Sequence, residues 1–276
     1  MSNNIHSISF PVKDSISEVV QSIIYNEISL SQDGFIDLFP IGSSVLSFSL
    51  DNLPLYFRDN LVSGPYNLTG QLTQHFRMRA VEGQYRTVMF ILKPYGAYRI
   101  FNTSQYPLQN NYFEIEILDQ TFLEHSNKLS QVSDAESYFE IVSEWIECRL
   151  LKSFPDDIYL SVRNFFDETD FQNTKLKVED LIAHYGSSKI TFERHFKKIT
   201  GLLPKQYISI SRFNSAYFLI NNNSSKSWLD VVSFLEYFDQ SHFIKEFKKY
   251  CGFTPSQLHQ SIFSIAGHVN EVNRSI

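Results

Sequence analysis

The spacing of hydrophobic and polar positions changes near residue 119. Before that point, short β-branched and aromatic runs are interrupted by Pro, Gly and Asn, for example in residues 37–50 and 85–102. Residues 112–118 alternate apolar and acidic side chains, which predicts a strand with one solvent-facing side. Short strands separated by such turn residues are typical of a β-sandwich or a β-barrel, so the front of the chain is predicted to be one of the two.

After residue 135 the apolar positions recur at helical spacing. They predict one helix over residues 136–152, with Ser133 or Asp134 as its N-cap, and a second helix over residues 155–168. Residues 168–177 are polar, as expected of a linker, and the pattern that follows them is helical. The prediction is an α+β protein with a front domain at residues 1–170 and an all-α domain at residues 171–276.

The predicted all-α domain contains an internal repeat. Residues 189–207 match residues 240–258 at an offset of 51, with seven identities in nineteen positions. The identical pairs are Phe192 and Phe243, Phe196 and Phe247, Lys197 and Lys248, Lys198 and Lys249, Gly201 and Gly252, Pro204 and Pro255, and Gln206 and Gln257. Upstream, residues 181–182 match residues 231–232 at an offset of 50, so the repeated unit is a helix, a turn and a second helix.

Each repeated position has a local physical role. The two phenylalanines are four residues apart, so they share one helix face and bury together. The two lysines lie in the last turn, where cations suit the helix dipole, and the glycine can adopt the left-handed C-cap conformation. Ser188 is the expected N-cap of the first copy, and Asp239 or Ser241 that of the second. The opposite face, from Ile190 to Lys197, is polar and cationic, which is typical of a helix that enters the major groove of DNA.

The segment between the copies and the distribution of charge point to the same kind of partner. Residues 204–220 predict a helix that would hold two reading helices about 34 Å apart, the distance between successive turns of one groove face. Eleven basic and 22 acidic side chains give residues 1–174 a net charge of −11, whereas residues 175–262 carry +5. A polyanion is therefore expected to bind the C-terminal domain.

Other chemistry is not indicated by the sequence. It has no motif for catalysis, nucleotide binding or metal binding, so no enzyme activity, cofactor or metal is expected. Cys148 and Cys251 are far apart and outside any CxxC pair, as expected for structural thiols in a reducing compartment. The chain has no apolar run of membrane-spanning length and no N-terminal signal pattern, so a cytoplasmic protein without a membrane partner is expected.

Residues 175–260 resemble the DNA-binding region of AraC/XylS-type transcription regulators. The resemblance rests on SSKITFERHFKKITGLLPKQY in the first unit, SRFNSA in the linker helix and EYFDQSHFIKEFKKYCGFTPSQL in the second unit. It implies two helix-turn-helix units. By position, it implies DNA contacts from Ile190, Thr191, Glu193, Arg194, Lys197, Gln240, Ser241, His242 and Lys245.

Three positions depart from the family pattern. Glu236 stands where the family has a turn glycine, Val232 where it has a small packing residue, and Lys245 where it has an arginine. The ammonium group of lysine is a point charge and cannot form the two parallel hydrogen bonds of an arginine guanidinium. The second unit is therefore expected to hold mainly phosphates. Arg194 in the first unit is the expected guanine contact.

The resemblance also implies a cupin-like N-terminal sensor or dimerisation domain, in a bacterial regulator that forms a homodimer and works with RNA polymerase. Residues 93–102 are similar to a strand pair with a Pro-x-Gly turn in such sensors. The candidates for binding a small-molecule effector that carries a carboxylate or phosphate are Arg77, Arg86, Tyr95 and Arg99, and plain surface positions are the competing interpretation of the arginines. The helix at residues 136–152, with Trp145, is expected either to form a dimer face or to pack against the front domain.

The sequence therefore predicts a sequence-specific regulator that binds double-stranded DNA and responds to a small ligand or a partner at its front domain. The alternative hypothesis is a small-molecule-binding β-barrel protein whose helical tail is a protein-docking module.

Overall fold

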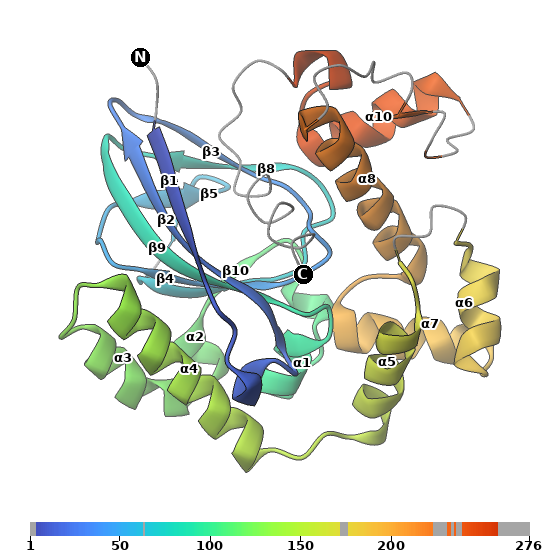
Figure 1. Cartoon of the computed structure of the whole chain (residues 1–276), viewed down its shortest axis with the longest axis horizontal. Helices are drawn as coiled ribbons and strands as arrows, with labels where there is room; N and C mark the ends of the chain where they lie inside the picture. Colours follow the sequence, from blue (N-terminus) through green and yellow to red (C-terminus); the bar gives the residue numbers. More distant parts are fainter. Residues whose placement is uncertain are drawn as a thin grey trace.

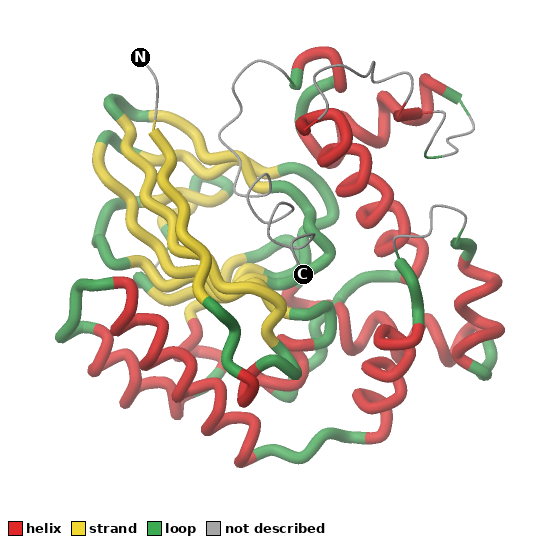
Figure 2. The backbone as a smooth tube through the Cα atoms, in the orientation of Figure 1, coloured by secondary structure: helices red, strands yellow, loops and turns green. Residues whose placement is uncertain are grey.

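The computed structural model of the chain describes residues 4–62, 64–171, 176–222, 231–232, 235 and 239–258. A β-rich front domain lies beside a helical C-terminal region, and further helices cover one side of the strands (Figures 1 and 2). The strands are β1 (Asn4–Phe10), β2 (Val20–Leu30), β3 (Gly34–Leu38), β4 (Val45–Ser49), β5 (Leu55–Phe57), β6 (Asn60–Leu61), β7 (Tyr66–Thr69), β8 (Phe76–Ala80), β9 (Gly83–Leu92) and β10 (Tyr112–Glu114).

The α-helices are α1 (Gly96–Phe101), α2 (Ile115–Leu118), α3 (Leu123–Leu129), α4 (Ala135–Lys152), α5 (Asp157–Glu168), α6 (Val178–Tyr185), α7 (Lys189–Thr200), α8 (Pro204–Asn222) and α10 (Gln240–Cys251). Short 3₁₀ helices occur at Asp14–Ile16, Tyr106–Leu108, Gln120–Phe122 and Pro255–Gln257. None of the described helices is both long enough and apolar enough to cross a membrane.

The strands form two antiparallel sheets and not one closed barrel. One sheet has the order β1-β2-β9-β4-β7-β10, and the other has the order β3-β8-β5-β6. The long β2–β9 ladder, which runs from Val20 opposite Leu92 to Leu30 opposite Gly83, is the spine of the larger sheet. Of the two predicted forms, β-sandwich and β-barrel, the structure is therefore the sandwich, with its sheets packed face to face.

Helix α4 closes the core of the front domain. Trp145 is 1% exposed, its ring lies 4.9 Å from that of Phe122, and its indole N–H donates to Asp119 at 3.0 Å. Asp134 is the N-cap, because its carboxylate accepts the backbone N–H of Ser137. The face of α4 that carries Trp145 thus packs against the front domain. Of the two expectations for this helix, a dimer face or packing against the front domain, the structure shows packing.

Two segments predicted as strands are partly helical in the structure. The alternation in residues 112–118 predicts a strand to its end, but β10 stops at Glu114 and α2 follows; Ile115 is buried, whereas Ile117 is 72% exposed. Residues 93–102 do not form a strand pair, because α1 begins at Gly96. A Cβ atom at Gly96 would lie 2.4 Å from the carbonyl oxygen of Val19, so this helix start packs directly on backbone.

Helix α5 belongs to both parts of the molecule. Tyr159 packs its ring 5.7 Å from that of Tyr95 in the front domain. Phe165, two turns further on, lies 5.3 Å from Phe192 of α7. The predicted domain boundary at residues 170/171 therefore separates Phe165 from the helices that it packs against.

Candidate nucleic-acid interface

The sequence repeat is a structural repeat. Helices α7 and α10 each have 12 residues, and each begins at the predicted N-cap. Ser188 Oγ accepts the N–H of Thr191 at 3.2 Å, and Asp239 Oδ1 accepts the N–H of His242 at 2.7 Å. Each helix ends at a left-handed glycine, Gly201 with φ of 82° or Gly252 with φ of 81°.

The backs of the two helices are buried by the repeated phenylalanines. Phe192, Phe196 and Phe243 are 0% exposed, and Phe247 is 1% exposed. In the first unit, Phe196 packs against α5 and α8; in the second unit, Phe247 lies 5.4 Å from Phe213 of α8. Because these faces are fixed in the core, the opposite faces are fixed toward the surface.

The nine residues predicted to contact DNA all remain accessible. Ile190 is 79% exposed. Fully exposed or half-buried positions are held by Ile190, Thr191, Glu193, Arg194 and Lys197 on α7 and by Gln240, Ser241, His242 and Lys245 on α10. Their assignment to DNA stays a prediction, but the surface that it requires is present on both helices.

Helix α8 sets the distance between the two units. It has 19 residues, so at 1.5 Å per residue it is about 28 Å long. Figure 1 shows α7 near one end of α8 and α10 near the other. This length is close to the roughly 34 Å that separates successive major grooves on one side of a duplex.

Arg194 lies exposed on the surface of α7, next to His195 in the chain. The pKa of the neighbouring His195 is lowered, first because the ring is partly desolvated and then because Arg194 and Lys198 lie nearby. The ring nitrogen of His195 lies 3.0 Å from the Tyr185 hydroxyl, inside the unit. His195 is therefore a neutral packing residue at pH 7, and the charge on this face comes from lysine and arginine.

Residues 181–261 match a protein-family model described as a helix-turn-helix domain. This region is an AraC-type helix-turn-helix domain. The match extends from Leu181 in α6 through α7, α8 and α10. Of the departures from the family pattern, Val232 is buried against the α8 and α10 core of the helix-turn-helix domain, and Glu236 lies outside the described residues.

Several solved structures are similar to the whole chain or to its helix-turn-helix domain. ToxT from Vibrio cholerae strain SCE256 with bound unsaturated fatty acid is 14% identical, with 85% of this chain and 94% of that chain covered and a TM-score of 0.47. ToxT from Vibrio cholerae O395 bound to (E)-4-(8-methylnaphthalen-1-yl)but-3-enoic acid is 11% identical, with 98% and 99% covered and a TM-score of 0.45. The C-terminal domain of AraT, a response regulator from Geobacillus stearothermophilus, is 19% identical, with 41% and 93% covered and a TM-score of 0.33. No curated protein matches the chain.

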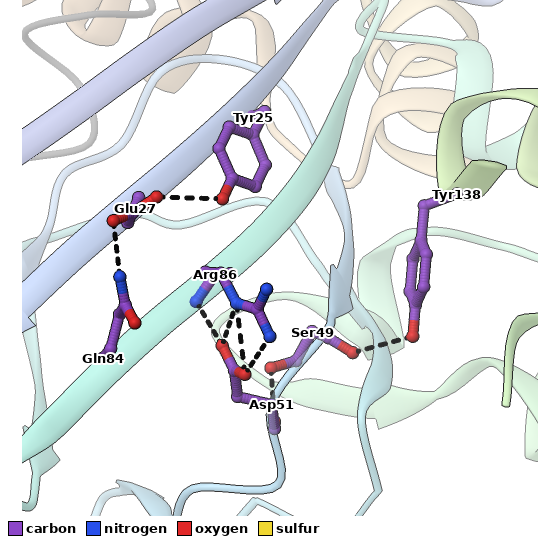
Figure 3. A network of polar contacts seen from close by, with 7 residues as sticks. All are labelled: Tyr25, Glu27, Ser49, Asp51, Gln84, Arg86 and Tyr138. Atoms are coloured by element: carbon purple, nitrogen blue, oxygen red, sulfur yellow. Dashed lines mark hydrogen bonds and ion pairs between the residues drawn. The ribbon is translucent and has the colours of Figure 1, made fainter. Parts of the chain in front are cut away.

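The residues predicted to bind an effector do not form one site. Arg86 is held by Asp51 through a 2.7 Å ion pair on the sandwich (Figure 3), and Arg77 is held by Asp37 at 2.9 Å. Tyr95 is 2% exposed beneath α5, and Arg99 is buried beneath the end of α4, where it donates to the carbonyl of Leu150. Each of the four has a structural partner: Arg77 and Arg86 lie on strands of different sheets, whereas Tyr95 and Arg99 lie one helical turn apart at α1.

A cavity of about 270 Å³ lies between the two sheets instead, and the sequence did not reveal it. Its walls are mainly apolar side chains such as Ile28, Met78 and Met89, with scattered amide and hydroxyl groups. Among the described residues that line it, Asp51 is the only charged one, and Arg86 neutralises that carboxylate. Buried polar residues inside strands are the available signal: Asn26 of β2 is 4% exposed, Asn67 of β7 is 6% exposed, and both line the cavity. Among the described residues, no three His, Cys, Asp or Glu side chains are grouped as a metal site.

Proposed function

We propose that this protein is a transcription regulator that binds double-stranded DNA sequence-specifically through its helix-turn-helix domain. The observation that carries the proposal is the pair of repeated helices at the two ends of α8, each with a phenylalanine back and an accessible polar front. The net charge of +5 on residues 175–262 favours a polyanionic partner over a basic or neutral one.

In the proposed complex the two helices have different tasks. Arg194 projects from the exposed face of α7 and can form two parallel hydrogen bonds with a guanine edge. Lys245 occupies the corresponding position on α10, where its single ammonium group suits a phosphate better than a base. The first unit would therefore specify sequence, and the second would mainly position the protein.

The test is selection of DNA from a random duplex pool by the full-length protein, followed by affinity measurements at several salt concentrations. Arg194→Ala is expected to cost about 1–3 kcal/mol on the selected site and to relax the preference at one base pair. Arg79→Ala, which removes an exposed charge from β8 of the front domain, is the matched control and should leave the selected site unchanged. Unchanged selection by Arg194→Ala would remove that residue from the readout, and a complete lack of DNA binding would favour the docking-module hypothesis.

We further propose that the front domain takes an uncharged, largely apolar small molecule in the cavity between the sheets. The lining offers hydrocarbon contacts and a few hydrogen-bonding groups, but the described residues that form it include no lysine, arginine or histidine to neutralise an anion. Native mass spectrometry of the purified full-length protein should therefore find a neutral molecule of mainly hydrocarbon character. Recovery of a carboxylate or phosphate compound would contradict this assignment. Homodimer formation, contact with RNA polymerase and a location in a bacterial cytoplasm belong to the same proposal.

A further inference from the structure

The front domain touches both helix-turn-helix units at positions that the repeat makes equivalent. The backbone N–H of Gln105 donates to the carbonyl of Lys198 at 2.9 Å, and the N–H of His75 donates to the carbonyl of Lys249 at 3.0 Å. Lys198 and Lys249 are 51 residues apart, which is the offset of the repeat. Both carbonyls lie in the last turn of a helix, where no intrahelical donor is available.

The closeness of both contacts depends on the two left-handed glycines. A Cβ atom at Gly201 would lie 3.0 Å from the carbonyl oxygen of Gln105, and one at Gly252 would lie 2.5 Å from the His75 ring. The side-chain amide of Gln109 adds a hydrogen bond of 3.0 Å to the carbonyl of Gly201. In both units, therefore, the same C-cap is covered by a segment of the front domain.

The two contacting segments are tied to each other; we name residues 71–75 and 105–110 the docking arms. Asn110 Oδ1 accepts the backbone N–H of Thr73 at 2.8 Å and its hydroxyl at 3.2 Å. The backbone N–H of Asn110 donates to the carbonyl of Gln71 at 2.9 Å. Asn110 has a φ of 59°, a conformation that glycine adopts without strain. One side chain thus braces the segments that hold the two units.

Docking also occupies cations that DNA would use. The ammonium group of Lys197 lies 3.3 Å from the centre of the Tyr106 ring, and that of Lys198 lies 3.4 Å from a carboxylate oxygen of Asp156. Hydrogen bonding to Tyr98, together with Asp156, raises the pKa of Lys198. The front domain, with its net charge of −11, is itself a competitor for the cationic face of α7.

We propose that the braced docking arms hold both helix-turn-helix units in one arrangement and that this docked state restrains DNA binding. The restraint rests on the proposed function, whereas the docking itself does not. Release of the arms would free both units together, because the brace is shared. It would also return Lys197 to the surface that faces a duplex, because its partner Tyr106 lies in an arm.

The test is Asn110→Gly in the full-length protein, which removes the brace and keeps the backbone conformation. Asn102→Gly is the matched control, because Asn102 has a φ of 49° at the C-cap of α1, is exposed and lies outside the arms. Hydrogen exchange followed by mass spectrometry reports the amides of Gln105 and His75. Asn110→Gly should accelerate both by about 10-fold or more, and Asn102→Gly neither. Gln109→Ala is a second variant, expected to accelerate the Gln105 amide.

The consequence for DNA is measured with the same proteins and one random-sequence duplex. Asn110→Gly should bind more tightly than the control, and its log–log salt slope should be steeper by up to about 0.9, the contribution of the one released lysine, Lys197. Unchanged exchange at both amides in Asn110→Gly and Gln109→Ala would overturn the docking arms. Faster exchange with unchanged or weaker DNA binding would overturn the restraint. Faster exchange in proteins that bind no DNA at all would sink the proposed function, and the restraint with it, but leave the docking arms established.

Discussion

Phe165 is the residue through which α5 most strongly supports the helix-turn-helix domain, and its replacement by alanine tests that role. The side chain is 3% exposed. Its ring centre lies within 6.3 Å of six others, those of Phe166, Phe171, His184, Tyr185, Phe192 and Phe196. Removal of a buried phenylalanine costs about 3–5 kcal/mol, and the loss of several edge-to-face ring contacts places this site near the upper end.

A loss of that size is a large fraction of the roughly 5–15 kcal/mol that stabilises an ordinary domain. Phe165→Ala should therefore unfold the helix-turn-helix domain at a lower urea concentration, as followed by far-ultraviolet circular dichroism of the full-length protein. The transition of the front domain should move less, because Phe165 packs against α6 and α7. A fragment of residues 155–276 should accordingly be more stable than one of residues 171–276.

Phe154→Ala is the matched control for this measurement. Phe154 precedes α5 and is 94% exposed, so its removal leaves no cavity and should change the stability by less than about 0.5 kcal/mol. If the two alanine variants unfold within 1 kcal/mol of each other, which is about the loss of one partly buried methylene, α5 is not part of the helix-turn-helix core. The reasoning from ring packing would then be refuted.

Two further outcomes concern α10 and the thiol at its end. Asp239→Ala should destabilise the helix-turn-helix domain by about 1 kcal/mol because the His242 N–H loses its acceptor, whereas Asp239→Asn should retain most of the stability; equal losses in thermal unfolding would argue against the cap. Burial raises the pKa of the Cys251 thiol to about 12, so in the folded protein at pH 8 iodoacetamide should modify Cys148, which is partly exposed, well before Cys251. Equal rates of modification by mass spectrometry would show that the second unit opens readily.

The elements that could be predicted from the sequence are those whose causes are local. Ser188, Asp239 and the repeated glycines fix the ends of α7 and α10 within a few residues, and phenylalanines four apart define the buried face. Helix α1 was missed because all five side chains from Ala97 to Phe101 are buried, on different sides of the helix, so no single-faced period remains. The alternation that suggested a strand to residue 118 is too short to exclude a helical turn.

The candidate effector site could not be predicted because its residues come together only in the folded sandwich. Strands β2, β4, β7 and β9 supply one wall of the cavity, and parts of β3, β5 and β8 supply the other. The arginines looked like ligands because their carboxylate partners are distant in sequence: Asp37 is 40 residues from Arg77, and Asp51 is 35 residues from Arg86. Ion pairs between residues so far apart in the sequence cannot be recognised from the spacing of a motif.

Gly201 and Gly252 each meet two requirements at once, the positive φ of the helix end and the close approach of the neighbouring segment. The family-type helix-turn-helix domain is consequently not an interchangeable cassette in this chain. A chimaera that carries the same two glycines but a differently shaped surface around them would fold its own helices and still sit wrongly against the sandwich. Grafting experiments should therefore transfer residues 71–75 and 105–110 together with the helix-turn-helix domain that they contact.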